Sequence, residues 1–91
     1  MATQNITIEN GGWQDLITLG SLSLTNSQSY AIAIFDADDN EVCLADSKPD
    51  TSFRGNPLRE RQNFTFTYTT GDKIWVKLGA VRLGAATVVL T

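Results

Sequence analysis

The chain has 91 residues, of which 42% are hydrophobic, and its formal net charge is −3. This length predicts a single domain, expected to span residues 1–91, with a thin core that oligomerisation would enlarge. The acidic balance argues against nucleic acid as a partner. The absence of histidine and the presence of one cysteine remove most zinc sites and all histidine-activated nucleophiles.

The N-terminal quarter alternates apolar and polar residues with the period of two that is typical of half-buried β-strands. Ile6 and Ile8, for example, fall on one face of their segment. Turns are expected at the glycine-containing breaks between the alternating segments. The expected strands are Thr3–Glu9, Trp13–Leu19 and Leu22–Thr25, and the expected turns between them are Asn10–Gly12 and Gly20–Ser21.

The segment Ser29–Asp36 is apolar on both faces, since Tyr30 and Ile32 alternate with Ala31 and Ala33. A strand of this kind belongs in the middle of a sheet or a sandwich. A turn rich in aspartate follows it at Asp36–Asn40, and the strand Glu41–Ala45 follows the turn. We therefore expect Ser29–Ala45 to form a β-hairpin.

The second half of the chain begins with a polar segment that contains two prolines and is expected to be the longest loop. Alternation then resumes, with Phe64, Phe66 and Tyr68 on one face of their segment. The expected elements are the loop Asp46–Pro57, the strands Arg59–Thr69, Lys73–Leu78 and Ala85–Leu90, and a turn at Gly79–Gly84. The fold class predicted from the whole pattern is all-β: a single small antiparallel β-sandwich or barrel of about seven to eight short strands.

The segment Asp36–Asn40 places side-chain oxygens at alternate positions, on Asp36, Asp38 and Asn40, as a calcium-binding loop does. Glu41 and Ser47, however, occupy the places where an EF-hand needs glycine and glutamate. A turn is the favoured interpretation, and a weak cation site is the alternative. If the segment is a turn alone, replacing Asp38 by alanine is expected to be nearly silent.

The sequence contains no recognisable set of catalytic residues. No Gly-x-Ser-x-Gly pattern and no phosphate-binding glycine loop is present, and Cys43 fits a small apolar residue within a strand. We therefore expect a protein that is not an enzyme, with no catalytic, cofactor-binding or metal-binding residues. Met1–Thr7 lacks the features of a secretion signal, and no apolar run reaches the roughly 20 residues of a membrane helix, so we expect synthesis in a cytoplasm and no membrane partner.

The candidate protein-interface residues are Arg54, Arg59, Arg61 and Trp75. Arginine is enriched at interfaces because its planar guanidinium pairs carboxylates through two hydrogen bonds. The alternative for the arginines is an ordinary solvated entrance to a strand. Trp75 falls on the face opposite Ile74 and Val76, so it is either packed or subunit-facing, or it forms an exposed platform for sugars.

The order of the segments carries a resemblance to a known class of proteins. After a short leading strand these segments are Gly12–Leu16, Gly20–Leu24, Tyr30–Ile34, Val42–Ala45, a loop with proline and glycine, an aromatic strand, Gly71–Lys77 and Gly84–Leu90. In their order they resemble small all-β virion structural proteins of tailed bacteriophages, over nearly the whole chain. The resemblance implies a capsid decoration protein located in the virion and synthesised in the host cytoplasm. It implies a homo-oligomer, with a trimer favoured over a dimer, that contacts other virion proteins such as the major capsid protein. The alternative is a tail- or fibre-associated β-sandwich module that binds host carbohydrate or receptor.

Overall fold

The computed structural model describes residues 4–9, 11–82 and 85–91. Seven strands of three or more residues dominate this part of the chain: β1 (Gln4–Glu9), β3 (Ser29–Phe35), β5 (Asn40–Ala45), β6 (Asn56–Leu58), β7 (Phe64–Thr67), β8 (Lys73–Lys77) and β10 (Ala85–Leu90). The remaining elements are the two-residue strands β2 (Gln14–Asp15), β4 (Ala37–Asp38) and β9 (Ala80–Val81) and the helix α1 (Leu16–Gly20). The predicted all-β class is confirmed.

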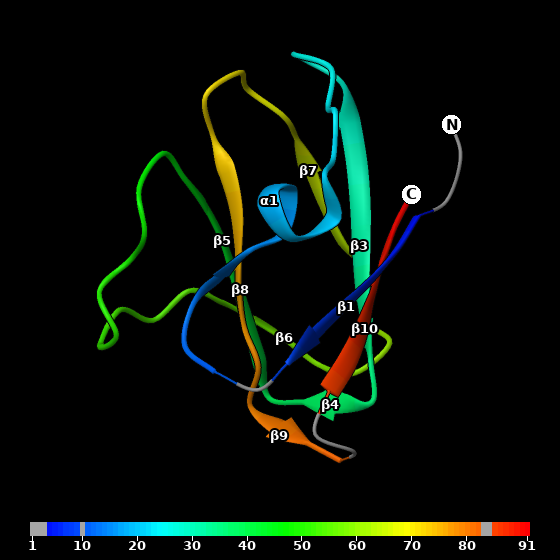
Figure 1. Cartoon of the computed structure of the whole chain (residues 1–91), viewed down its shortest axis with the longest axis vertical. Coiled ribbons are helices and arrows are strands. Elements are labelled where there is room, and N and C mark those ends of the chain that lie inside the picture. The colour runs from blue at the N-terminus through cyan, green and yellow to red at the C-terminus, as the bar shows by residue number, and fades with distance from the viewer. Residues whose placement is uncertain (1–3, 10, 83–84) are drawn as a thin grey trace.

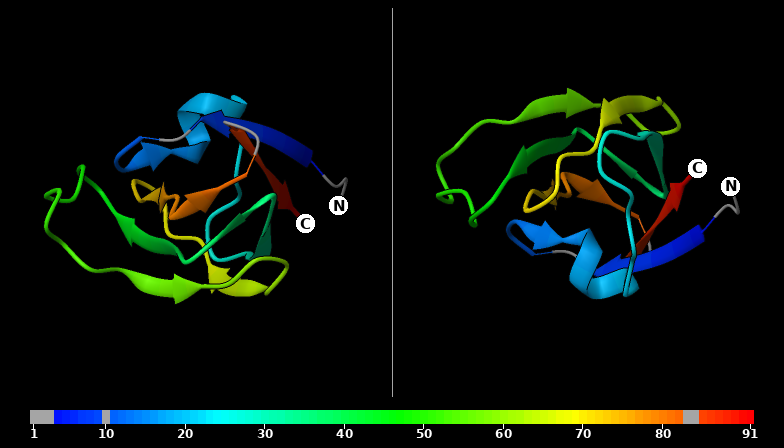
Figure 2. Two further views of the ribbon diagram at one scale, coloured as in Figure 1. Left: turned by 90° about the horizontal axis from the view of Figure 1, so that it is seen from below. Right: turned by 90° about the horizontal axis from the view of Figure 1, so that it is seen from above.

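The strands form two four-stranded antiparallel sheets and one small pair. Sheet A has the order β1-β10-β3-β7, sheet B has the order β2-β8-β5-β6, and β4 pairs with β9 at one end (Figure 1). The first and last strands pair along their full length, from Gln4 opposite Leu90 to Glu9 opposite Ala85. Views along the perpendicular direction show the two sheets as separate layers (Figure 2).

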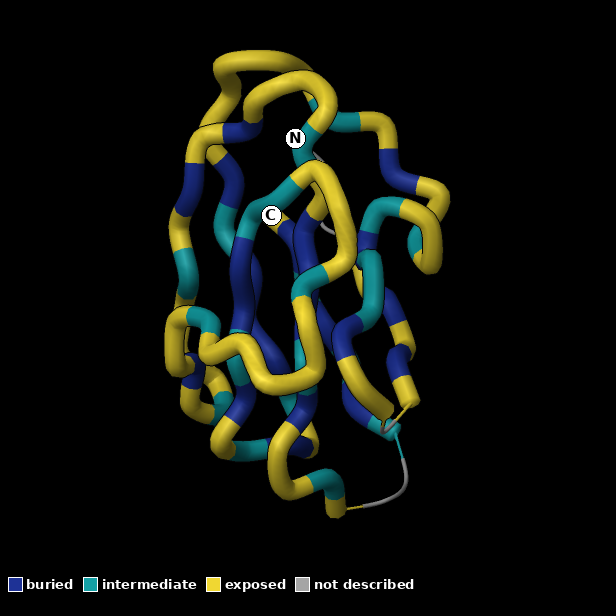
Figure 3. The backbone as a smooth tube through the Cα atoms, turned by 90° about the vertical axis from the view of Figure 1, so that its left-hand side faces the viewer, coloured by how far each residue is buried: buried dark blue, intermediate teal, exposed yellow. Residues whose placement is uncertain are grey.

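The core lies between the two sheets and is built from the inward-facing residues of each alternating strand. Its fully buried members are mostly β-branched or leucine, as expected for packed β-layers. They include Ile8, Leu16, Ile32, Ile34, Val42, Leu58, Ile74, Val76, Val88 and Leu90. In Figure 3 the buried positions run through the strands, and the exposed positions collect in the connecting loops. Among the described residues, no helix is long and apolar enough to cross a membrane.

The expected hairpin between Ser29 and Ala45 is wrong, because β3 belongs to sheet A and β5 to sheet B. The chain changes sheets through β4, which is flanked by two residues with left-handed backbone conformation, Asp36 at φ 69° and Asp39 at φ 55°. Aspartate tolerates this region better than most residues, so the two bends redirect the chain. A tight hairpin would have placed β3 and β5 side by side in one sheet.

The expected strand Trp13–Leu19 is also wrong beyond its first residues, because α1 begins at Leu16. Asp15 caps this helix: its Oδ1 accepts from the backbone N–H of Ile17 at 3.0 Å, and its Oδ2 accepts from the Thr18 hydroxyl at 2.7 Å. Ser21 ends the helix in the left-handed conformation, at φ 49°. A side-chain acceptor at the N-cap offers these backbone groups the partners that a strand would otherwise supply.

Several expected boundaries shift. The loop after β5 ends at Gly55, because β6 pairs its Pro57 with Glu41 at the edge of sheet B, where a proline is tolerated. The expected strand over 59–69 shortens to β7, and 22–25 forms no strand. The expected turn at 79–84 contains β9. Thr3, Asn10 and Gly84, which bound three of the expected elements, lie outside the described residues.

Candidate protein-interaction site

The three candidate arginines do not form one cluster in the structure. Arg54 and Arg59 both line a groove of about 480 Å³ beside β5 and β6, which we call the arginine groove. Arg61 instead lies over the ring of Phe35, at 5.9 Å from the ring centre, on sheet A. The complete lining of the groove is Asp39, Asn40, Glu41, Arg54, Gly55, Pro57, Leu58 and Arg59.

Both guanidinium groups of the arginine groove are open to solvent. The Arg54 side chain is 88% exposed and its Nε lies 4.0 Å from Glu41 Oε2. The Arg59 side chain is 74% exposed and its Nη2 lies 3.5 Å from Asp38 Oδ2. Ion pairs of this length and exposure contribute little to stability. Contacts within the chain therefore use little of the hydrogen-bonding capacity of either guanidinium.

The backbone around the arginine groove is held by local contacts that need small residues. The other carboxylate oxygen of Glu41, Oε1, accepts from the backbone N–H of Gly55 at 2.7 Å, which fixes the end of the β5–β6 loop (46–55). A Cβ added at Gly55 would come within 2.8 Å of the Val42 carbonyl oxygen and within 2.8 Å of the Trp13 ring. Such contacts are closer than atoms tolerate, so glycine is required where the loop approaches sheet B.

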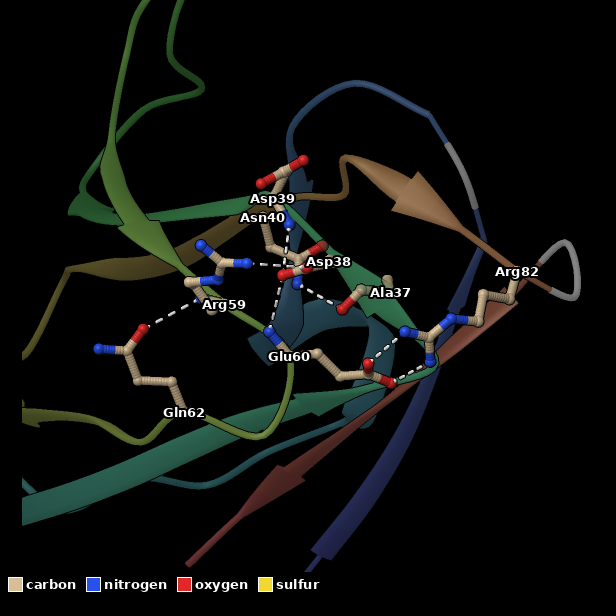
Figure 4. A network of polar contacts seen from close by, with 8 residues as sticks. All are labelled: Ala37, Asp38, Asp39, Asn40, Arg59, Glu60, Gln62 and Arg82. Carbon is tan, nitrogen blue, oxygen red and sulfur yellow. Dashed lines mark hydrogen bonds and ion pairs between the residues drawn. The ribbon is translucent and has the colours of Figure 1, made fainter.

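A polar network lies next to the arginine groove and joins three segments of the chain (Figure 4). Asp38 Oδ1 accepts from the backbone N–H of Asp39 at 2.9 Å and from that of Glu60 at 3.1 Å. Glu60 in turn receives two hydrogen bonds from the Arg82 guanidinium, at 2.6 Å and 2.5 Å, in the bidentate geometry that carboxylates favour. Asp38 therefore ties β4 to the segment before β7, so the condition on which Asp38→Ala was expected to be nearly silent, a turn alone, is not met.

Asn40 is the buried polar side chain of this region, with an exposed fraction of 1%. Its Nδ2 donates to the Ala37 carbonyl at 2.9 Å, and its Oδ1 accepts from the Gly79 backbone N–H at 3.2 Å. The side chain thus joins the link between β4 and β5 to the end of β8. Sequence reasoning placed Asn40 in a turn and did not single out Arg82, because neither residue belongs to a recognisable motif.

Two carboxyl groups of this network, those of Asp38 and Glu60, have a pKa below the ordinary value. The hydrogen bonds from Arg82 lower the pKa of Glu60, and the hydrogen bond from the Asp39 backbone N–H lowers the pKa of Asp38. The charged forms are therefore favoured in the folded chain relative to the unfolded chain. The resulting stabilisation is present above the unfolded values, which are about 3.9 for Asp and 4.3 for Glu, and is lost as the pH falls through the folded values.

Replacing Glu60 by glutamine is expected to flatten the acid limb of the stability profile. The native chain should lose unfolding free energy as the pH falls below about 4, and Glu60→Gln should lose less over the same range, because one linked carboxylate is gone. Chemical unfolding between neutral and acid pH measures this slope. Glu9→Gln, an exposed site on β1, is the matched control and should keep the native slope. If unfolding free energy falls with pH equally steeply for Glu60→Gln and for the native chain, the lowered pKa of Glu60 is contradicted.

Trp75 does not offer its ring to a partner, because it is buried, at 7% exposure, beside Trp13 and Cys43. Its Nε1 donates to the Ala45 carbonyl at 3.2 Å. The β5–β6 loop covers this cluster, since Trp13 Nε1 donates to the Asp50 carbonyl at 3.2 Å. Trp75 is therefore packed, as one of the two interpretations expected, and it is removed from the candidate interface residues. Cys43 is buried in β5, as expected for a small apolar strand residue.

No three histidine, cysteine, aspartate or glutamate side chains converge as a metal-ligand set within the part of the chain that the structure describes. In the Asp36–Asn40 segment, two of the carboxylates take part in other contacts or surfaces. Asp38 binds backbone amides and Arg59, and Asp39 lines the arginine groove. Comparisons with protein-family models, with curated proteins and with solved structures found no match for this chain.

Proposed function

We propose that this chain is a non-enzymatic structural protein of a tailed-bacteriophage virion, acting as a capsid decoration protein that forms homo-oligomers and stabilises the shell. The order of the sequence segments that resemble small all-β virion proteins supports this class of protein. The arginine groove carries the functional part of the proposal, because it presents two exposed guanidinium groups on a surface that the fold holds in place.

The chemistry of the arginine groove fits an acidic segment of a partner protein, such as a shell protein. Each guanidinium of Arg54 and Arg59 can bind a carboxylate through two parallel hydrogen bonds. The lining holds Asp39 and Glu41 beside the two arginines, so attraction of an acidic segment rests on the two exposed guanidinium groups and not on the net charge of the groove. Contacts between exposed charges of this kind make binding sensitive to salt.

The alternative function, a tail- or fibre-associated module that binds host carbohydrate or receptor, needs exposed aromatic rings. Two aromatic candidates for such a platform, Trp75 and Tyr68, are buried at 7% and 9% exposure. Phe53 is the aromatic that favours this alternative, because it is 47% exposed and packs on Trp13 with ring centres 6.1 Å apart. A single exposed ring gives less support than the paired arginines.

Reversing both groove charges, with Arg54→Glu and Arg59→Glu combined, is expected to weaken binding to expanded capsid shells by about tenfold or more, which corresponds to about 1.4 kcal/mol. The reason is that two attractive contacts become repulsive while the fold keeps its core. Co-sedimentation of the chain with shells at low and at high salt measures the effect.

The control is Lys48→Glu, which makes the charge change of one of these two substitutions at an exposed position of the β5–β6 loop outside the groove. It should bind shells nearly as well as the native chain. If the double variant and the control bind alike, the arginine groove is not the contact. If the native chain binds no shell at all but does bind host polysaccharide, the alternative function takes its place.

A further inference from the structure

The β5–β6 loop covers a second apolar cluster, separate from the core between the two sheets. This tryptophan cluster consists of Trp13, Cys43 and Trp75, with Ala45 packed against it. The register places Cys43 opposite Trp75 on neighbouring strands, and the residues on either side of each belong to the main core. The tryptophan cluster therefore lies on the outer face of sheet B, where the loop shields it from water.

The β5–β6 loop has few buried side chains of its own. All of its residues except Pro49 and Gly55 are exposed. Phe53 packs on Trp13 but keeps nearly half of its surface in water. In Figure 1 the loop forms the green excursion beside β5 and β8, and Figure 3 shows its mostly exposed surface. A segment with so few buried contacts opens at a lower free energy than the whole domain.

Side chains of sheet B, and of the residue before it, hold the loop by its backbone carbonyl groups. Trp13 Nε1 donates to the Asp50 carbonyl at 3.2 Å, and Lys77 Nζ donates to the Thr51 carbonyl at 3.1 Å. Both bonds join a side chain to the loop, so both can break without breaking any pairing between strands. The loop can therefore leave sheet B while sheet B stays intact.

The end of the β5–β6 loop forms part of the arginine groove, since Arg54 and Gly55 both line it. Glu41 Oε1 accepts from the Gly55 backbone N–H at 2.7 Å. The backbone at Gly55 also approaches the Trp13 ring closely, because an added Cβ would come within 2.8 Å of that ring. One residue of the loop thus touches both the arginine groove and the tryptophan cluster.

We propose that the β5–β6 loop opens as a unit while both sheets stay folded, and that its closure over the tryptophan cluster assembles the arginine groove. An open loop carries Arg54 away from Arg59. A partner that binds the assembled groove holds the loop shut, and loop opening weakens the partner's binding in return. The inference deepens the proposed function, on which its role in shell binding rests.

Cys43 reports on the loop, because it is the one cysteine of the chain and is buried within the tryptophan cluster. Its burial, and then the Glu41 carboxylate, raise the pKa of its thiol. The thiolate is the reactive form, so the closed state reacts slowly with alkylating reagents. Labelling of the full chain with N-ethylmaleimide, followed by mass spectrometry, therefore measures how often the loop opens.

The dependence of the labelling rate on urea separates loop opening from unfolding of the domain. Opening of the loop exposes little surface, so the rate should stay almost constant at urea concentrations well below the unfolding midpoint. It should rise steeply only where the sheets unfold. A labelling rate that follows global unfolding at every urea concentration would overturn the proposal.

Replacing Lys77 by methionine removes one anchor of the loop and keeps an unbranched side chain. Without urea, Lys77→Met should raise the labelling rate of Cys43 by about fivefold, as expected for one lost hydrogen bond. The control is Ile34→Val in the centre of sheet A, which weakens the core but should leave the rate unchanged. If Lys77→Met labels as slowly as the native chain, the loop is not what protects Cys43.

A pair of substitutions at Glu41 tests the link between the loop and the arginine groove. Glu41→Ala removes the acceptor for the Gly55 N–H, whereas Glu41→Gln keeps a side-chain oxygen there. Both remove the same charge beside Cys43, so the difference between them reports the hydrogen bond. Glu41→Ala should label about fivefold faster than Glu41→Gln. Equal rates would show that the groove does not hold the loop, and the proposed link would fail.

Expanded capsid shells test whether a bound partner holds the loop shut. With shell sites at about ten times the Kd found by co-sedimentation, labelling of Cys43 should slow by about tenfold. The combined Arg54→Glu and Arg59→Glu variant should lose this protection. Shells that bind the native chain without slowing its labelling would overturn the coupling. If the chain binds no shells, the proposed function fails, while the urea and Glu41 results still decide whether the loop opens and holds the groove.

Discussion

Replacing Ile32 by aspartate is expected to unfold the domain. Ile32 is fully buried in β3, where its neighbours are Leu90 on β10 and Phe64 on β7. A domain of this size has about 5–14 kcal/mol of stability. The substitution removes apolar packing worth about 2–5 kcal/mol and buries a carboxylate that has no partner, which costs several more. Circular dichroism and urea unfolding should show the loss of cooperative structure at room temperature.

The control for this prediction is Ser29→Asp, which places the same carboxylate three residues earlier in β3, at an exposed outward position. It should change stability by no more than about 0.5 kcal/mol. The comparison isolates burial from charge and from strand propensity. A cooperative, native-like unfolding curve for Ile32→Asp would contradict the placement of β3 between its two neighbours in sheet A.

The alternation of apolar residues was enough to predict the fold class and most of the strands. Ile6 and Ile8, and likewise Phe66 and Tyr68, lie on inward faces as the period of two indicated. The reason is that a strand with one buried face must repeat its side chains in this way, whatever its neighbours are. The presence of a strand can therefore be predicted from the residues of that segment alone.

Strand pairing was not predictable in the same way, because it depends on backbone bends that few residues specify. The sequence Asp36–Asn40 is compatible with a hairpin turn, and nothing local distinguishes a hairpin from a crossing between two sheets. The crossing is fixed by contacts from distant segments: the Asn40 side chain meets Gly79, and Asp38 meets the Glu60 backbone. The helix α1 was missed for a related reason, since one capping residue, Asp15, decides it.

The candidate site could be predicted in part. The sequence grouped Arg54 with Arg59, and the structure brings these two side chains together along one groove. Arg61 is adjacent in sequence but lies on the other sheet, because it has a left-handed backbone conformation, at φ 67°, and its N–H donates to the Ile34 carbonyl at 2.9 Å. Closeness in sequence does not decide which face of a sandwich a loop residue occupies.

Replacing Gly79 by alanine is expected to destabilise the domain by about 3 kcal/mol, which lowers the midpoint of thermal unfolding by more than about 10 °C. A Cβ at this position would overlap the Asp39 carbonyl oxygen and come within 2.5 Å of the Asp38 carbonyl oxygen. These are backbone atoms, so no side-chain rotation relieves the clash. The backbone of β4 has to move away, which also breaks the hydrogen bond from Gly79 N–H to Asn40.

The functional consequence follows from where the displaced backbone lies. Asp39 lines the arginine groove and Asp38 pairs with Arg59, so a shift at Gly79 should also weaken shell binding at temperatures where the variant is still folded. Gly12→Ala is the matched control, because a Cβ there meets no atom within 4 Å. Differential scanning calorimetry should find Gly12→Ala within about 0.5 kcal/mol of the native chain. A Gly79→Ala variant as stable as this control would show that β4 and the end of β8 are not in contact, and the arginine groove would then lose the support on which its geometry depends.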